Sequence, residues 1–172
     1  MIVWIDGPYG VGKSTLAEAM HRNNPDSFLF DAEAVGNAVR DNLPKALFRG
    51  YIFEHYSLWH ETIRALLREI ASGFSGDVYV PMTLVFPDSF VRIADPLRAE
   101  GIPIAHVLLE APAGTVRERI LARGEEEGCW CMEHIGLCIE NQSRFSDVIR
   151  VPTHGRTPEE LAYTVKHILE SR

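Results

Sequence analysis

Residues 1–14 read MIVWIDGPYGVGKS, and residues 7–14 within them match the pattern GxxxxGK[ST] in full. An apolar run precedes the match, and a stretch of helical period that begins at Lys13 follows it. Glycines let such a loop wrap tightly, so that backbone N–H groups point inward, and the N-terminus of the next helix adds positive potential. The order of strand, loop and helix therefore predicts a cradle for the phosphates of a nucleotide.

Two residues of this loop carry predicted chemical roles. Lys13 reaches the β- and γ-phosphates as a point charge, and the Ser14 hydroxyl can ligate a magnesium ion that bridges the same phosphates. The sequence has no NKxD-like segment of the kind that reads guanine, so we expect ATP with Mg²⁺ as the bound nucleotide. Thr15 is expected mainly as a helix residue beside the site. The predicted nucleotide-binding set is Gly7, Pro8, Tyr9, Gly10, Val11, Gly12, Lys13, Ser14 and Thr15.

Outside the loop, short apolar runs alternate with longer stretches of helical period. This alternation is typical of βαβ units, in which helices cover both faces of a parallel sheet. We expect one three-layer α/β/α domain over residues 1–172, with about five strands, in the nucleotide-kinase-like variant of the P-loop NTPase fold. The segment TPEE at 157–160 opens the last helix with a capping box. The predicted strands are 2–5, 28–30, 78–80, 104–109 and 148–151, and the predicted helices are 13–22, 32–42, 55–72, 88–100, 114–123 and 158–170.

Composition and charge limit the class of protein. The 172 residues are 46 % hydrophobic and 24 % charged, as in a globular chain, and the formal net charge of -7 argues against broad binding to nucleic acid. No basic segment precedes the first apolar run, and Asp6 and Gly7 interrupt it, so we expect a cytoplasmic protein without a signal peptide or membrane span. Cys129, Cys131 and Cys138 are odd in number, which suits reduced thiols. A weak peripheral contact with a membrane and a homodimer stay open.

One carboxylate follows the second predicted strand. Asp31 lies at the carboxyl end of that strand, which borders the ligand crevice in open α/β sheets. It can act as a general base that accepts the proton of a substrate hydroxyl, or it can simply cap the helix that begins at Ala32. Both interpretations stay open from the residues alone. The third strand ends in Pro81, Met82 and Thr83 rather than in an acid, which disfavours a motor-type ATPase.

A pair of arginines precedes an acidic, glycine-flanked segment. Arg119 and Arg123 lie four residues apart on one helical face, and GEEEGCWC follows at 124–131. We expect a lid at about residues 119–135, in which the two arginines clamp phosphates and the segment 124–131 forms a mobile loop over the site. The alternatives are a solvated basic face paired with Glu118 and with the EEE run at 125–127, and a plain surface turn.

The residues that bind the acceptor are predicted from charge and aromatic content. Arg40, on the helix after Asp31, is a candidate for holding the substrate, with a surface ion pair as the alternative. An aromatic cluster follows it and can form the wall of an acceptor pocket or part of the core. The predicted acceptor-binding set is Asp31, Arg40, Phe53, Tyr56, Trp59 and Thr83.

Five segments together resemble the tunicamycin-resistance protein family of P-loop kinase-like proteins: MIVWIDGPYGVGKS, FDAEAVGNAVRDNLP, HYSLWHETIRALL, VPMTLVFPDSF and TVRERILAR. The resemblance implies an ATP-binding protein that protects cells against tunicamycin, a uridine-containing nucleoside antibiotic with sugars and a fatty acyl chain. It also implies that Asp31 falls where the catalytic acid of similar kinases lies, and Arg119 and Arg123 where their lid arginines lie. The part of the chain after Cys131 resembles the family less clearly.

These observations lead to one predicted function and two alternatives. We expect a phosphotransferase that moves the γ-phosphate of ATP to a hydroxyl of the nucleoside antibiotic, with Lys13, Asp31, Arg119 and Arg123 as catalytic residues. A housekeeping kinase for a nucleoside, nucleotide or other small metabolite would use the same residues. A protein that binds the drug in an ATP-dependent way and sequesters it would explain the missing acid after the third strand and the aromatic cluster.

Overall fold

The computed structural model describes residues 1–171 and has one five-stranded sheet, in which every strand pair is parallel. The strands are β1 (Ile2–Asp6), β2 (Phe28–Leu29), β3 (Val78–Pro81), β4 (Ile104–Glu110) and β5 (Ile149–Pro152), in the order β2-β3-β1-β4-β5. All five residues of the central strand β1 are buried, because helices cover both faces of the sheet. The predicted parallel α/β sheet is therefore confirmed.

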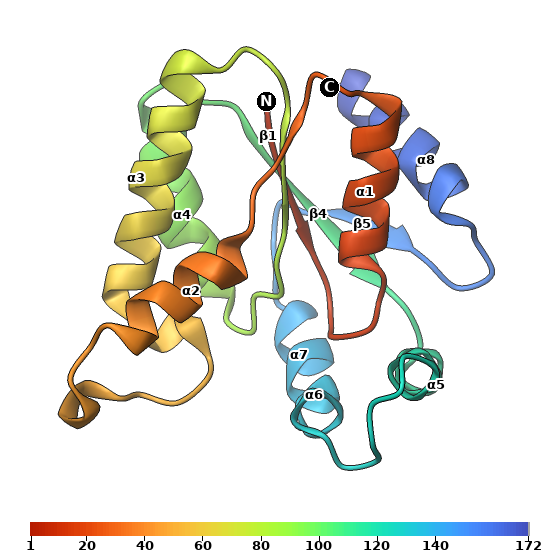
Figure 1. Cartoon of the computed structure of the whole chain (residues 1–172). Helices are drawn as coiled ribbons and strands as arrows, with labels where there is room; N and C mark the ends of the chain where they lie inside the picture. The colour runs from red at the N-terminus through yellow and green to blue at the C-terminus, as the bar shows by residue number, and fades with distance from the viewer. Residues whose placement is uncertain (172) are drawn as a thin grey trace.

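Two pairs of helices cover the sheet (Figure 1). The helices α1 (Lys13–Asn23) and α8 (Pro158–Glu170) lie together on one face, and α3 (Ser57–Gly73) and α4 (Pro87–Ala99) lie on the other, with α2 (Ala32–Asp41) beside α3. The predicted capping box of α8 is present: Glu160 N donates to Thr157 Oγ1 over 3.2 Å, and Thr157 N donates to Glu160 Oε2 over 2.8 Å. Within residues 1–171, no helix is both long and apolar enough to cross a membrane.

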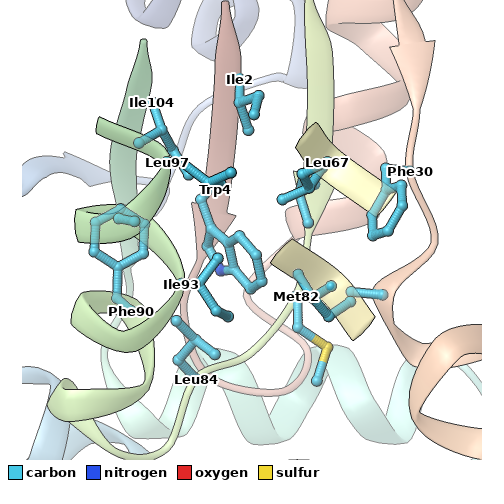
Figure 2. Close-up of a cluster of buried hydrophobic side chains, with 14 of the residues drawn as sticks. Ile2, Trp4, Phe30, Leu67, Met82, Leu84, Phe90, Ile93, Leu97 and Ile104 are labelled. Atoms are coloured by element: carbon cyan, nitrogen blue, oxygen red, sulfur yellow. The ribbon is translucent and has the colours of Figure 1, made fainter. Parts of the chain in front are cut away.

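Alternate side chains of β1 pack into two separate parts of the core. Ile2 and Trp4 point toward α3 and α4, where Trp4 packs among Leu67, Ile93 and other apolar side chains (Figure 2). Val3 and Ile5 point the other way, into the cluster beneath α1 and α8. This alternation is the period of two that a strand imposes on its side chains. Because β1 packs into both clusters, its position in the sheet is fixed, and the strand leads directly into the phosphate-binding loop.

The connections at the carboxyl ends of the strands contain the elements that the sequence did not predict. Between α2 and α3 lie two short 3₁₀ turns, η1 (Lys45–Leu47) and η2 (Phe53–His55). After α5 (Ala113–Ala122) come the short helices α6 (Trp130–Glu133) and α7 (Ile135–Gln142), for which the sequence analysis predicts no helix. They form because their apolar side chains pack against Val116 and Ile120 of α5. In Figure 1, α5, α6 and α7 surround the loop that follows β1.

Candidate active site

The loop between β1 and α1 requires glycine at two close approaches. The φ of Gly7 is 143°, and a Cβ there would lie 2.7 Å from the carbonyl oxygen of Leu109. The φ of Gly10 is 82°, and a Cβ there would lie 2.6 Å from Ile120 Cγ1 on α5. Both positions would be strained and crowded with any other residue. The glycines of the motif therefore bring the loop backbone against β4 and α5.

Lys13 folds back over the start of this loop. Its Nζ donates to the carbonyl oxygens of Gly7 over 3.0 Å and Pro8 over 3.1 Å, and lies 5.6 Å from the centre of the Tyr9 ring. Burial lowers the pKa of Lys13 below its ordinary value, while the negative charges of Asp6 and Glu33 act in the opposite direction. The ammonium group thus lies inside the loop, where a phosphate group would meet it.

Asp6, the last residue of β1, holds the start of the phosphate-binding loop in place. Its side chain is fully buried, and Oδ1 accepts from Gly7 N over 2.6 Å and from Leu84 N over 2.9 Å. Its other oxygen, Oδ2, lies 3.0 Å from Nε2 of the buried His106. Because both oxygens are engaged inside the protein, Asp6 has a structural role.

A pocket of about 440 Å³ lies between the loop, α5 and the start of α8, and Arg119, Arg123 and Arg156 all line it. Arg119 Nη1 donates to Val11 O over 2.9 Å and to Thr153 Oγ1 over 3.0 Å, and Nη2 donates to Thr153 O over 3.2 Å. These bonds go to Val11 and Thr153 and not to Glu118, while the neighbouring Arg117 pairs with Glu127 of the acidic run over 2.8 Å. Arg119 instead joins the phosphate-binding loop to the end of β5.

Arg156 belongs to the same pocket, although the sequence analysis did not single it out. Its Nη2 donates to Glu160 O over 3.3 Å and to Thr164 Oγ1, which holds the guanidinium against the first turns of α8. Arg123 ends α5 and is exposed. The three guanidinium groups give this pocket the positive charge that the net acidic chain needs in order to bind a polyanion.

A second pocket of about 240 Å³ lies on the other side of α1, between Ser14 and the start of α2. Three exposed carboxylates line it, those of Glu18, Asp31 and Glu33. Asp31 Oδ1 accepts from Ala34 N over 2.9 Å, so Asp31 caps α2 and faces the pocket at the same time. Ser14 lines both pockets, while Thr15 lines only the first.

The oxygen atoms around this second pocket fit a magnesium ion. The exposed hydroxyl of Ser14 and the carboxylate of Glu33 are hard donors of the kind that Mg²⁺ prefers. Mg²⁺ usually keeps several waters and takes only one or two protein ligands beside the phosphates of a nucleotide. Bound there, the ion would neutralise part of the phosphate charge.

Two members of the predicted acceptor-binding set need correction. Tyr56 and Trp59 are 3 % and 0 % exposed, so their side chains form part of the core and not an open wall. The Tyr56 hydroxyl donates to Gly50 O over 3.0 Å, and Trp59 Nε1 donates to Ala32 O over 3.1 Å. The reason is the position of these residues at the start of α3, whose apolar stripe faces the sheet.

Thr83 also has a different place from the one predicted. It is 1 % exposed, and its Oγ1 donates to Gly7 O over 3.0 Å. Thr83 therefore supports the phosphate-binding loop from the loop that follows β3. An acceptor molecule would have to displace this bond in order to contact the hydroxyl.

Arg40 and Phe53 lie together at the edge of α2. Arg40 Nε pairs with Asp41 Oδ1 over 2.8 Å, so the ion pair named as the alternative is present. Its guanidinium carbon lies 5.5 Å from the Tyr51 ring centre and 5.7 Å from that of Phe53. Phe53 is half-buried and packs closely on Gly36, where a Cβ would lie 2.4 Å from the ring.

The predicted lid region contacts the phosphate-binding loop through aromatic rings. The Tyr9 and Trp130 ring centres lie 5.0 Å apart in an edge-to-face arrangement, and Trp130 stacks on His134 at 4.1 Å. Tyr9 also packs on the cluster formed by Val116, Ile120 and Ile135. The region thus contacts the phosphate-binding loop through Tyr9, while its role as a lid and the mobility of residues 124–131 stay predictions.

An all-parallel sheet whose central strand runs through GPYGVGKS into a helix defines a P-loop protein with a kinase-type fold. The family model of the AAA domain, AAA_33, matches residues 2–130, and the chain belongs to this family. No curated protein matches the sequence.

Solved structures share the fold. The tunicamycin resistance protein of Deinococcus radiodurans is similar with a TM-score of 0.81 and 24 % identity, over 98 % of this chain and 94 % of that one. Shikimate kinase from Bacteroides thetaiotaomicron has a TM-score of 0.65 and 17 % identity, over 99 % and 98 % of the two chains. APS kinase from Mycobacterium tuberculosis also has a TM-score of 0.65 and 17 % identity, over 98 % and 96 %. The predicted resemblance is therefore confirmed at the level of the fold.

Proposed function

We propose that this protein binds ATP with Mg²⁺ and transfers the γ-phosphate to a hydroxyl group of a small molecule. The observation that carries the proposal is the place of Ser14, which lines both the arginine pocket and the acidic pocket. A nucleotide whose phosphates lie in the cradle would have its terminal phosphate at this junction. An acceptor in the acidic pocket would then meet that phosphate beside Asp31.

Each proposed catalytic residue has a task that follows from its position. Lys13 contacts the β- and γ-phosphates once it exchanges its bonds to Gly7 O and Pro8 O for phosphate oxygens. Arg119 and Arg123 stabilise the charge that spreads over the phosphoryl group during transfer. Ala34 N occupies one oxygen of Asp31, which leaves the other to accept the hydroxyl proton.

For the acceptor we propose tunicamycin. The support is the sequence resemblance to the tunicamycin-resistance family, together with the fold shared with the Deinococcus radiodurans tunicamycin resistance protein. The antibiotic offers nucleoside and sugar hydroxyls, and a hydroxyl is the group that a carboxylate base beside a γ-phosphate activates.

The test is to incubate the protein with labelled ATP, Mg²⁺ and a panel that holds tunicamycin, nucleosides, nucleotides and small sugars. We expect a tunicamycin species that is heavier by one phosphoryl group in mass spectrometry. Transfer to another nucleoside or metabolite alone would identify a metabolic kinase. Tight binding of tunicamycin without any labelled product would identify a sequestering protein.

A further inference from the structure

A buried carboxylate that the proposed reaction does not use lies in η2. Glu54 is 9 % exposed, although both of its neighbours in the turn are more open to solvent. Its Oε1 accepts from Val85 N over 2.6 Å, and its Oε2 accepts from Phe86 N over 3.0 Å. These are consecutive residues at the end of the loop between β3 and α4. One carboxylate thus accepts two adjacent backbone N–H groups at the start of a helix.

The same loop is bonded to the phosphate-binding loop at its other end. Thr83 Oγ1 donates to Gly7 O over 3.0 Å, and Leu84 N donates to Asp6 Oδ1 over 2.9 Å. From α7, Gln142 Nε2 donates to Leu84 O over 3.4 Å. Residues 82–86 therefore connect the nucleotide cradle, α7 and η2. The backbone N–H groups of this loop are held by two carboxylates from other elements, Asp6 of β1 and Glu54 of η2.

We infer that Glu54 is a positioning residue for phosphoryl transfer: by accepting the N–H groups of Val85 and Phe86 it fixes the β3–α4 loop, and through Thr83 the carbonyl of Gly7. Gly7 belongs to the phosphate-binding loop, and Asp6 Oδ1 accepts from both Gly7 N and Leu84 N, so a loose β3–α4 loop would shift the backbone that receives the phosphates. This inference rests on the proposed kinase function. Glu54 lines neither the arginine pocket nor the acidic pocket, so we assign it a role only through the loop.

The charge state of Glu54 matters because only the ionised carboxylate offers acceptors to both N–H groups. Burial raises the pKa of Glu54 to about 7, although the bonds from Ser89, Val85 and Phe86 lower it in part. The titratable groups that face it are Asp6 on β1, Tyr9 on the phosphate-binding loop and Cys138 on α7. The neighbouring His55 lies against Phe86, with ring centres 5.6 Å apart. Near neutral pH, the fraction of molecules in which Glu54 accepts both N–H groups therefore depends on the pH.

The test compares Glu54→Gln with Glu54→Asp and with Glu61→Gln, a matched change on the exposed face of α3. Glu54→Gln keeps the shape but turns one acceptor into a donor that faces an N–H group. We expect it to lower kcat about tenfold to a hundredfold, with little change in the KM for ATP. In the wild type kcat should fall as the pH drops through about 7, and this fall should be absent in Glu54→Gln. Glu54→Asp should recover part of the loss, and Glu61→Gln should match the wild type.

A second measurement separates this inference from the proposed function. Hydrogen exchange of the Val85 and Phe86 amides measures their hydrogen bonds to Glu54 directly. We expect this exchange to become about tenfold faster or more in Glu54→Gln, while the amides of β1 keep their protection. If wild-type protein phosphorylates no acceptor, the proposed function fails, and the exchange data still decide whether Glu54 holds the loop. Unchanged exchange, or an unchanged kcat and pH profile in an active Glu54→Gln protein, would overturn the inference.

Discussion

The two pockets that meet at Ser14 carry opposite charge. On one side of α1 the lining includes Arg119, Arg123 and Arg156, and on the other it includes Glu18, Asp31 and Glu33. A triphosphate is attracted to the first pocket and repelled by the second. Under the proposed function, this difference gives the site a direction: the donor would bind on the arginine side, and the acceptor hydroxyl would lie on the carboxylate side.

The variant with the largest expected effect on the proposed division between donor and acceptor pockets is Asp31→Asn. A carboxamide cannot accept the hydroxyl proton, so turnover should fall by roughly a hundredfold to ten-thousandfold while ATP still binds. Asn caps helices about as well as Asp, so α2 should keep its stability. Turnover by phosphorylated product and melting by circular dichroism would measure the two effects. Normal turnover in a folded variant would leave Asp31 as a cap only.

Lys13→Ala tests the cradle on the donor side. Loss of the ammonium removes a contact to the transferring phosphate, and we expect kcat/KM to fall by about a hundredfold to a thousandfold. Lys45→Ala in the exposed turn η1 is the control for a simple loss of positive charge. ATP affinity by calorimetry and turnover should both separate the two variants. Equal behaviour of the two would remove the loop from the mechanism.

Arg119 and Arg123, the two arginines of the predicted lid, should differ from each other. Both Ala variants should slow transfer more than they weaken ATP binding, because they are proposed to stabilise transition-state charge. Arg119→Ala also removes three hydrogen bonds to Val11 and Thr153, which we expect to cost about 1–3 kcal/mol of unfolding free energy. Arg123→Ala should leave the unfolding free energy nearly unchanged, since Arg123 is exposed. Loss of stability alone, with normal transfer in both, would contradict the clamp.

The last prediction concerns how the free energy of unfolding depends on pH through Glu54. Its pKa is raised from 4.5 to about 7 in the folded protein, so the unfolded chain releases the proton first as the pH rises. The contribution of Glu54 to the free energy of unfolding is therefore full below about pH 4.5 and is lost as the pH rises to about 7. Relative to Glu54→Gln, the wild type should lose up to about 3 kcal/mol across this pH range. Urea unfolding at several pH values measures the difference, and a constant difference would show that Glu54 does not titrate there.

The donor side could be predicted from the sequence because its parts are local. The strand, the loop and the helix that form the cradle are consecutive, and the glycine spacing itself states the backbone geometry. Arg119 was found because it lies one helical turn from Arg123. Arg156 was missed, since only the packing of α8 beside α1 brings it to the pocket.

The acceptor side could be predicted only in part. Asp31 follows a strand end, which is a local signal, but the aromatic residues depend on tertiary packing. Trp59, Ile63 and Leu67 recur at intervals of four residues and are all 0 % exposed, so this stripe is core. Glu54 carried no signal in the sequence, because its burial comes from the 3₁₀ turn and from partners about thirty residues away.

The contact between Tyr9 and Trp130 supplies a built-in optical probe. The chain has three tryptophans, and Trp4 and Trp59 are fully buried, while Trp130 is half-buried and lies edge-on to a ring of the phosphate-binding loop. Its fluorescence should respond to acrylamide quenching, and the other two should be shielded. A change in the acrylamide-quenchable emission on nucleotide addition would therefore report on Trp130, and Trp130→Phe should remove that change.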